Sequence, residues 1–302
     1  MAYITTMSTA PRIFDRQAYR ARRARAVRTE GDAILVGDTA DQAALRIAAI
    51  NRRFTRGLDL HSRREAFPAL APLADGWIRT GNRPDAPSVV ADDEWLPFAE
   101  ASFDLITSIL SLHAVNDLPG VLAQLRRLLR PDGLFIAAMF GGETLRELRA
   151  AFAAAEDETL GGASPRVAPF ADVRDLGGLL QRAGFALPVA DVERTVVRYR
   201  ELPRLFSDLR AIGETNVLAT RKLEALSKRM LAAVIGEYQT RFGDPEGRLP
   251  ATFEIVFLTG WAPHESQQKP LRPGSAKARL SDALGTTEQN AGETVPRLKS
   301  KS

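Results

Sequence analysis

The chain has 302 residues, of which 45% are hydrophobic and 26% charged, with three histidines and no cysteine. A length near 300 residues predicts one large domain, or one domain with appendages. The absence of cysteine excludes disulfides, cysteine-ligated zinc, iron–sulfur clusters and thiol catalysis, and three scattered histidines argue against a metal site. No apolar run approaches the roughly twenty residues that cross a bilayer, so we expect no transmembrane segment.

The net charge of +4 is unevenly distributed along the chain. Residues 1–30 carry +5 and residues 266–302 carry +4, so the 235 residues between them carry −5. Because a nucleic-acid groove is normally basic within the folded body, we expect no nucleic-acid partner. We interpret both basic ends as solvated and 266–302 as largely disordered. No apolar signal region follows the first charges, and we predict a cytoplasmic bacterial protein.

Apolar patterns predict helices and strands in alternation from residue 14 to residue 261. Phe103–Leu112 and Leu134–Phe140 are apolar over most of their length, which is typical of strands buried on both faces of a sheet. The predicted helices are 14–28, 38–54, 118–129, 143–156, 172–183, 202–212 and 219–239. The predicted strands are 57–60, 77–80, 88–91, 103–111, 134–140, 193–199 and 251–261.

Strands that alternate with helices predict an α/β fold, a largely parallel sheet with helices on both faces. We expect 103–111 and 134–140 to be adjacent in that sheet and 251–261 to run antiparallel. Ligands of such sheets bind beyond the carboxyl ends of the strands, where the strand order reverses. Three segments reach that edge: the turn after residue 60, the loop 91–98 and residues 108–116.

Three segments in order resemble the class I S-adenosylmethionine (SAM) methyltransferases. They are ADDEWLPF (91–98), SFDLITSILSLH (102–113) and LRRLLRPDGLFIAAMFGGETL (125–145). In that superfamily an acid before a Leu-Pro-Phe turn lies over the adenine, and an Arg-Pro-Asp-Gly turn opens the fifth strand. The resemblance implies a Rossmann-like, seven-stranded class I methyltransferase sheet with a SAM pocket.

A second resemblance covers nearly the whole chain, to the methyltransferase-like assembly factor of mitochondrial respiratory complex I and its bacterial relatives. The segments that carry it are FDR (14–16), AINRRF (49–54), SLHAVNDLPG (111–120), MFGGETLRELR (139–149), SPR (164–166), GETN (213–216), LPATFEI (249–255) and GWAPHESQQKP (260–270). The mitochondrial member is regarded as a protein-arginine hydroxylase that acts on a complex I subunit. The bacterial relatives are usually labelled SAM-dependent methyltransferases, related to the malonyl-carrier-protein methyltransferase of biotin synthesis.

This second resemblance also predicts how the chain is divided. We expect an N-terminal helical segment (1–56) that packs on the core, then a methyltransferase-like domain (57–265). A helical insertion at about 201–240 caps the site, and the basic tail (266–302) follows. We expect the arginines of the N-terminal helix to lie in water.

The sequence departs from the family where SAM binds. The family has Asp-Leu-Gly-Cys-Gly-x-Gly after the first strand, whereas residues 59–65 read DLHSRRE, which replaces all three glycines. Those glycines let the backbone approach the ligand and adopt positive φ, and a side chain there costs roughly 1–2 kcal/mol. Glu65 would repel the methionine carboxylate, although Arg63 or Arg64, which we expect to be solvated, could offset it. Gly81-Asn82 stands where the family has the acid that binds the ribose.

Two groups of side chains are candidates for the site. For an adenosyl ligand they are Asp59, His61, Asp92, Asp93, Ser108 and Ser111, with Asp92 at the adenine and Asp59 at the methionine ammonium. For catalysis they are His113, after the fourth strand, and Glu214 and Asn216 of the insertion. The alternatives are a structural histidine and a helix cap.

Three functions remain open. The first is a SAM-dependent methyltransferase, in which the protein aligns a nucleophile with the methyl group that the cofactor supplies. The second is a protein-modifying enzyme or assembly factor for respiratory complex I, whose substrate is a protein, a complex I subunit according to the resemblance. The third is a non-catalytic binding factor on this fold. The rebuilt glycine loop predicts that SAM binds weakly or not at all.

Overall fold

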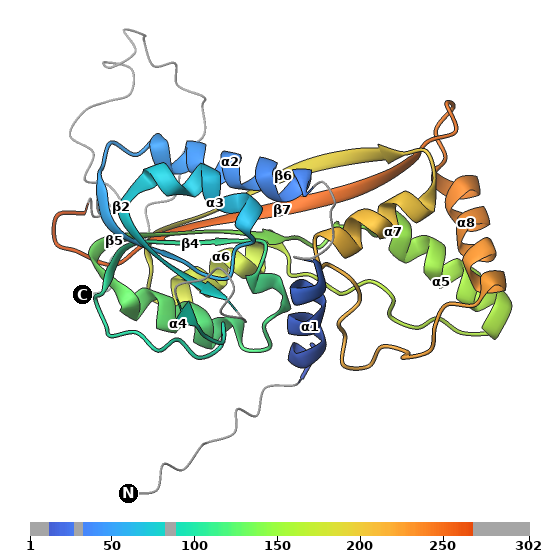
Figure 1. Cartoon of the computed structure of the whole chain (residues 1–302), viewed down its shortest axis with the longest axis horizontal. Helices are drawn as coiled ribbons and strands as arrows, with labels where there is room; N and C mark the ends of the chain where they lie inside the picture. Colours follow the sequence, from blue (N-terminus) through green and yellow to red (C-terminus); the bar gives the residue numbers. More distant parts are fainter. Residues whose placement is uncertain (1–11, 27–32, 82–88, 268–302) are drawn as a thin grey trace, which may run out of the picture. The chain divides into compact units, whose positions relative to one another are not determined.

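The computed structural model describes residues 12–26, 33–81 and 89–267 (Figure 1). Two compact units, 1–264 and 265–302, make up the chain, and the first holds all the helices and strands described here. The predictions for the two chain ends beyond these ranges, and for Asn82, lie outside the described residues. The strands are β1 (Phe54–Asp59), β2 (Ala74–Gly81), β3 (Val89–Val90), β4 (Phe103–Ile109), β5 (Leu129–Phe140), β6 (Ala186–Tyr199) and β7 (Leu249–Trp261).

Seven strands form one sheet in the order β3-β2-β1-β4-β5-β7-β6, which confirms the predicted fold class. The first five in this order run parallel, and β7 pairs antiparallel with both β5 and β6. β4 and β5 are adjacent, as their apolar runs predict, and β4 is buried along its whole length. The order reverses between β1 and β4, so their carboxyl ends form the crevice where ligands of open α/β sheets bind.

Helices cover both faces of the sheet (Figure 1). The α2 and α3 helices belong to one buried apolar cluster, which continues into α5, α7 and α8, and α4 and α6 belong to the cluster on the other face. The helices are α1 (Arg16–Ala26), α2 (Ile34–Ala48), α3 (Phe67–Leu70), α4 (Leu118–Leu128), α5 (Arg146–Leu160), α6 (Val173–Arg182), α7 (Leu202–Ala211) and α8 (Lys228–Phe242). None of the helices in the described ranges has the length and apolar character that a bilayer crossing requires.

The structure corrects two predicted helices. The helix predicted over 38–54 ends at Ala48, and Phe54 already belongs to β1. The helix predicted over 219–239 begins only at Lys228, because the Ser227 side chain accepts from the Met230 amide and caps α8 there. Residues 219–227 therefore form an extended loop instead of continuing the helical part of the insertion.

Candidate functional site

The α1 helix contacts the carboxyl ends of β1 and β4 at the point where the strand order reverses. The Arg23 guanidinium donates through Nη2 to the His61 carbonyl (2.8 Å) and through Nη1 to the Leu110 carbonyl (2.7 Å). These carbonyls lie just beyond the ends of the two strands. Arg23 is 8% exposed, so an arginine side chain of the chain itself fills the crevice.

A tyrosine of the same helix completes this contact. The Tyr19 hydroxyl accepts from Arg23 Nη1 (2.9 Å) and donates to the Ser111 carbonyl (3.2 Å). Burial, the largest cause, raises the pKa of Tyr19 well above its usual range, so the hydroxyl keeps its proton. Arg23 and Tyr19 therefore join α1 to the sheet through hydrogen bonds that solvent does not reach.

Serine side chains close the floor of the crevice. The Ser62 hydroxyl accepts from the Ile109 amide (2.8 Å), which ties the loop after β1 to the end of β4. The hydroxyl oxygens of Ser108 and Ser111 lie 2.6 Å apart, and both lie within hydrogen-bond distance of the Leu60 carbonyl, at 3.1 and 3.2 Å. The structure thus brings Ser108 and Ser111 together, but their hydrogen bonds connect parts of the chain to one another.

His61 takes the place of the first family glycine and keeps the conformation that a glycine would allow. Its φ is +54°, in the left-handed region. Its Nε2 lies 2.8 Å from Asp93 Oδ1, and the other oxygen of Asp93 accepts from Arg16 Nη2 (2.6 Å). Burial would raise the pKa of Asp93, but His61 and then Arg16 hold it well below its usual range. Asp93 is therefore an ionised, fully buried carboxylate that contacts both His61 and Arg16.

The other two predicted cofactor residues are also paired within the chain. Asp92 forms ion pairs with Arg16 and Arg20 of α1. Asp59 accepts from Arg79 Nε (3.2 Å), while burial raises its pKa. All six predicted cofactor residues lie at the crevice or at the contact with α1, as the sequence predicted for this edge. None of them belongs to the cavity described below.

The prediction that the arginines of this region lie in water is wrong for three of them. Arg23 is buried and the side chain of Arg16 is only 12% exposed, and both lie against the acids and carbonyls named above. Arg63 is 7% exposed, and its Nε lies 3.2 Å from Glu65. Arg64 is exposed as expected and pairs with the same carboxylate. Carboxylates distant in the sequence supply the partners of Arg16 and Arg23, whereas the partner of Arg63 is two residues away.

Two of the three catalytic candidates form a pair. His113 Nε2 lies 2.9 Å from Glu214 Oε2, and Arg23 Nη1 lies 3.5 Å from the other oxygen. Burial opposes ionisation of Glu214, but His113 and Arg23 lower its pKa below the usual value. The Asn216 amide instead donates to the Pro165 carbonyl and accepts from the Leu218 amide, so it shapes its own loop.

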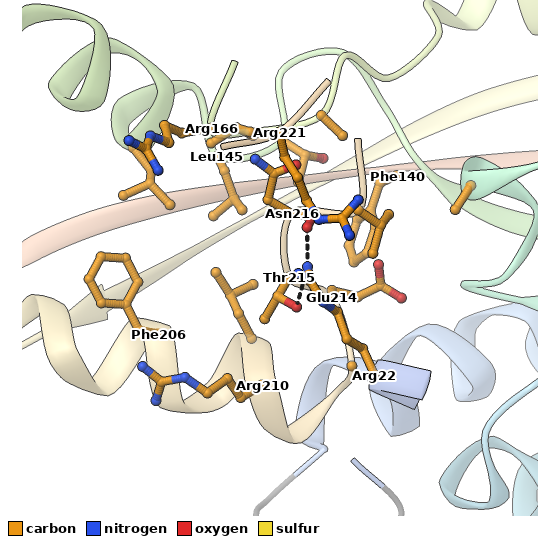
Figure 2. A pocket seen from close by; sticks show the side chains of 18 of the residues that line it. Arg22, Phe140, Leu145, Arg166, Phe206, Arg210, Glu214, Thr215, Asn216 and Arg221 are labelled. Carbon is orange, nitrogen blue, oxygen red and sulfur yellow. Dashed lines mark hydrogen bonds between the residues drawn. The ribbon is translucent and has the colours of Figure 1, made fainter. Parts of the chain in front are cut away.

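A cavity of about 680 Å³ opens beside this pair (Figure 2). α1, α5, α7 and the loops at 165–170 and 213–226 contribute its walls. The apolar part includes Phe140, Leu145, Phe152, Phe170, Phe206 and Phe253. The basic part comprises Arg22, Arg25, Arg166, Arg210, Arg221 and Lys222. Of the lining residues, only His113, Glu214 and Asn216 were predicted as site candidates, because the wall forms only when residues 213–226 fold against the sheet and α5.

Comparison with known proteins gives matches of several kinds. A family model described as a methyltransferase domain matches residues 71–137. The mitochondrial arginine-hydroxylase NDUFAF5 of Homo sapiens is 40% identical over 295 residues, which cover 91% of this chain and 85% of that protein. The malonyl-[acyl-carrier protein] O-methyltransferase of Laribacter hongkongensis is 40% identical over 190 residues, 63% of this chain and 61% of that protein.

A solved structure extends the likeness to the fold. A protein of Bacillus halodurans, described as a methyltransferase, superposes with a TM-score of 0.50 at 14% identity. The superposition covers 74% of this chain and 99% of that one. At this identity the match shows the shared fold alone, and it agrees with the strand order found here.

Proposed function

The chain belongs to the methyltransferase-fold family of the NDUFAF5 arginine-hydroxylases, and from this premise we propose that it binds a protein partner in the assembly of respiratory complex I. The link to complex I rests on the family resemblance, and the partner is a protein, such as a subunit of that complex. We place this role in the bacterial cytoplasm, whereas the NDUFAF5 relatives are named as mitochondrial. The observation that favours a binding role over SAM-dependent methyl transfer is the crevice filled by Arg23.

The residues at the crevice do not fit SAM. A SAM ammonium group would need acceptors at the ends of the central strands, and there the Arg23 guanidinium already binds both the His61 and Leu110 carbonyls. A ligand at this place would also meet the His61 side chain, which is held against Asp93. These contacts support a SAM site that is weak or lost, and we derive no reaction step through SAM.

Isothermal calorimetry with SAM and S-adenosylhomocysteine tests the proposal. We expect no saturable heat from the unmodified protein, and ordinary low-micromolar affinity would overturn the loss of the SAM site. A matched variant restores the family pattern through His61→Gly, Arg63→Gly, Glu65→Gly and Gly81→Asp. If this variant binds SAM and the unmodified protein does not, the rebuilt loop is what blocks the ligand. A SAM-binding methyltransferase of the same fold serves as the positive control.

Deletion of the gene tests the link to respiratory complex I. We expect the deletion strain to contain less assembled complex I on native gels, and the unmodified gene to restore it. The Ser111→Ala variant, which removes a predicted cofactor contact, should restore assembly equally well if SAM has no part. A deletion strain with a normal amount of the complex would refute the assembly role.

The His113–Glu214 pair favours catalysis as a second candidate function. Nε2 of His113 faces Glu214, and its buried Nδ1 has no hydrogen-bond partner within the described residues. In this arrangement Glu214 orients the ring and leaves Nδ1 as a hydrogen-bonding atom that no described residue engages. Mass spectrometry of complex I subunits would test it, since a modification that disappears in both His113→Ala and Glu214→Gln strains requires the pair.

A further inference from the structure

The cavity beside α1 has far more positive than negative charge on its wall. Six lysine or arginine side chains line it, whereas Glu214 is the only carboxylate among the described residues that do so. His113 and Arg23 already hold Glu214. The lining therefore has little negative charge that could bind a cationic ligand, and a ligand in the cavity would be surrounded mainly by positive charge.

Acids behind the wall neutralise only part of this charge. Arg166 pairs with Glu156 (2.6 Å), and Arg221 pairs with Asp15 (2.8 Å). Lys222 lies 4.0 Å from Glu156, which it shares with Arg166. The two carboxylates of Glu156 and Asp15 thus pair with three cationic side chains, so the cavity wall retains an excess of positive charge.

The hydrogen-bond acceptors of Arg22, a cation on this wall, are neutral. Its Nη1 donates to the Thr215 hydroxyl (3.0 Å) and to the Asn216 carbonyl (Figure 2). Burial, followed by the positive charges of Arg221 and Arg25, lowers the pKa of Arg22. A half-buried guanidinium with like charges beside it would gain from an anion at this place.

The rest of the cavity is apolar. Phe140 and Leu145 come from the end of β5 and the start of α5, and Phe206 comes from α7 (Figure 2). A volume of about 680 Å³ lies within the range of cavities that hold one small molecule, roughly 300–1,000 Å³. An apolar body of that size would bury its surface here while its charged end stays near Arg22.

We propose that this cavity binds a small amphipathic anion, a carboxylate or phosphate on an apolar chain, with the head group at Arg22 and the chain against Phe140, Leu145 and Phe206. The proposal goes beyond the assembly role and does not depend on the fate of the SAM site. Arg22 and the α7 side chains make none of the crevice contacts described above. The arginine side chain that the relatives' name implies as substrate would be repelled by this wall.

Calorimetry with four ten-carbon probes below their micelle concentrations tests the proposal. Decanoate and decyl phosphate should bind saturably at one site, and the tighter of the two identifies the preferred head group. Decanol, which has the same chain without the charge, should bind at least tenfold more weakly, and decylammonium should not bind. Equal affinity for decanol and both anions, or no saturable binding of either anion, would overturn the proposal.

A matched pair of variants on one helix, α7, tests whether the anion binds inside this cavity. Arg210 lines the cavity, whereas Arg204, on the same helix, pairs with Asp208 and does not line it. Arg210→Gln should weaken decanoate binding severalfold and Arg204→Gln should leave it unchanged. Both side chains are exposed, so both variants should fold. Arg22→Gln, checked by its melting temperature, should weaken binding at least tenfold. Equal effects of Arg204→Gln and Arg210→Gln would refute the assignment.

Discussion

One buried guanidinium, that of Arg23, satisfies backbone groups that the two central strands leave open at their ends. It donates to the carbonyls of His61 and Leu110 and to the Tyr19 hydroxyl. A buried acceptor without a donor costs about 1–3 kcal/mol of stability. Because Arg23 is the donor to two carbonyls, its removal would incur this cost more than once. Arg23 is therefore a structural element of the crevice as well as an obstacle to a ligand there.

Arg23→Leu should lower the free energy of unfolding by about 3 kcal/mol, because leucine fills the space but leaves both carbonyls without a donor and removes the Arg23 contact to Glu214. Urea denaturation followed by circular dichroism measures the change. Arg64→Leu is the control, since the Arg64 side chain is 61% exposed and its loss should change stability by less than about 0.5 kcal/mol. A loss below about 1 kcal/mol for Arg23→Leu would contradict the role given to Arg23.

Asp93 should make stability depend on pH in the acid range. Its pKa is below the usual range in the folded protein and about 3.9 in an unfolded chain. Its ionised form therefore stabilises the fold above about pH 4, and this contribution disappears as the pH falls further. Asp93→Asn should be less stable than the unmodified protein at pH 6, and the difference should shrink at pH 3. Urea denaturation at both pH values measures it, and a constant difference would refute the assignment.

At the scale of elements, the residues before α1 are tied to two distant parts of the chain. The Asn116 side chain accepts from the amides of Ile13 (2.9 Å) and Phe14 (2.8 Å), and it donates to the Phe14 carbonyl (3.2 Å). Phe14 also forms an antiparallel bridge with Leu218 in the loop that precedes α8. Because α1 fills the crevice and contributes to the cavity wall, this attachment fixes both sites at once.

Asn116→Ala should release the N-terminal segment without disturbing the sheet, since alanine accepts neither amide. Hydrogen–deuterium exchange should show at least tenfold faster exchange in residues 12–26 and unchanged protection in β4 and β5. Asn51→Ala provides the control, because Asn51 is exposed in the turn before β1. Unchanged protection of residues 12–26 in Asn116→Ala would show that the Asn116 hydrogen bonds are not needed to hold α1 in place.

For the whole molecule, local patterns predicted the sheet and long-range pairing decided the site. The strands β4 and β5 were predictable because burial on both faces requires continuous apolar runs. The burial of Arg16 and Arg23 was not predictable from the sequence. Their carboxylate partners lie some 77 and 191 residues away along the chain, and sequence spacing does not reveal such pairs. The left-handed His61 was predictable from the family glycine that it replaces. The cavity was not, because its wall forms only when residues 213–226 fold over β5 and α5.

The first compact unit, residues 1–264, ends shortly after the last strand, β7. Trp261 pairs with Leu134 of β5 and Ala186 of β6, and the amide of Ala262 donates to the Gly133 carbonyl (2.8 Å). In return the amide of Asp132 donates to the Ala262 carbonyl (3.1 Å). The last residues of β7 are therefore needed to complete the sheet, whereas the residues beyond His264 belong to the second unit.

Two truncations should separate these parts of the chain. Removal of residues 280–302 should leave the melting temperature nearly unchanged, because only four of these 23 residues are leucine or valine and the segment has little apolar surface to bury. Removal of everything after Thr259 takes away Trp261 and the Ala262 hydrogen bonds, and should lower the melting temperature by more than about 5 °C, roughly 1–2 kcal/mol in a domain of this size. Differential scanning calorimetry measures both. A drop of more than about 5 °C on removal of 280–302 would mean that the tail packs against the folded body.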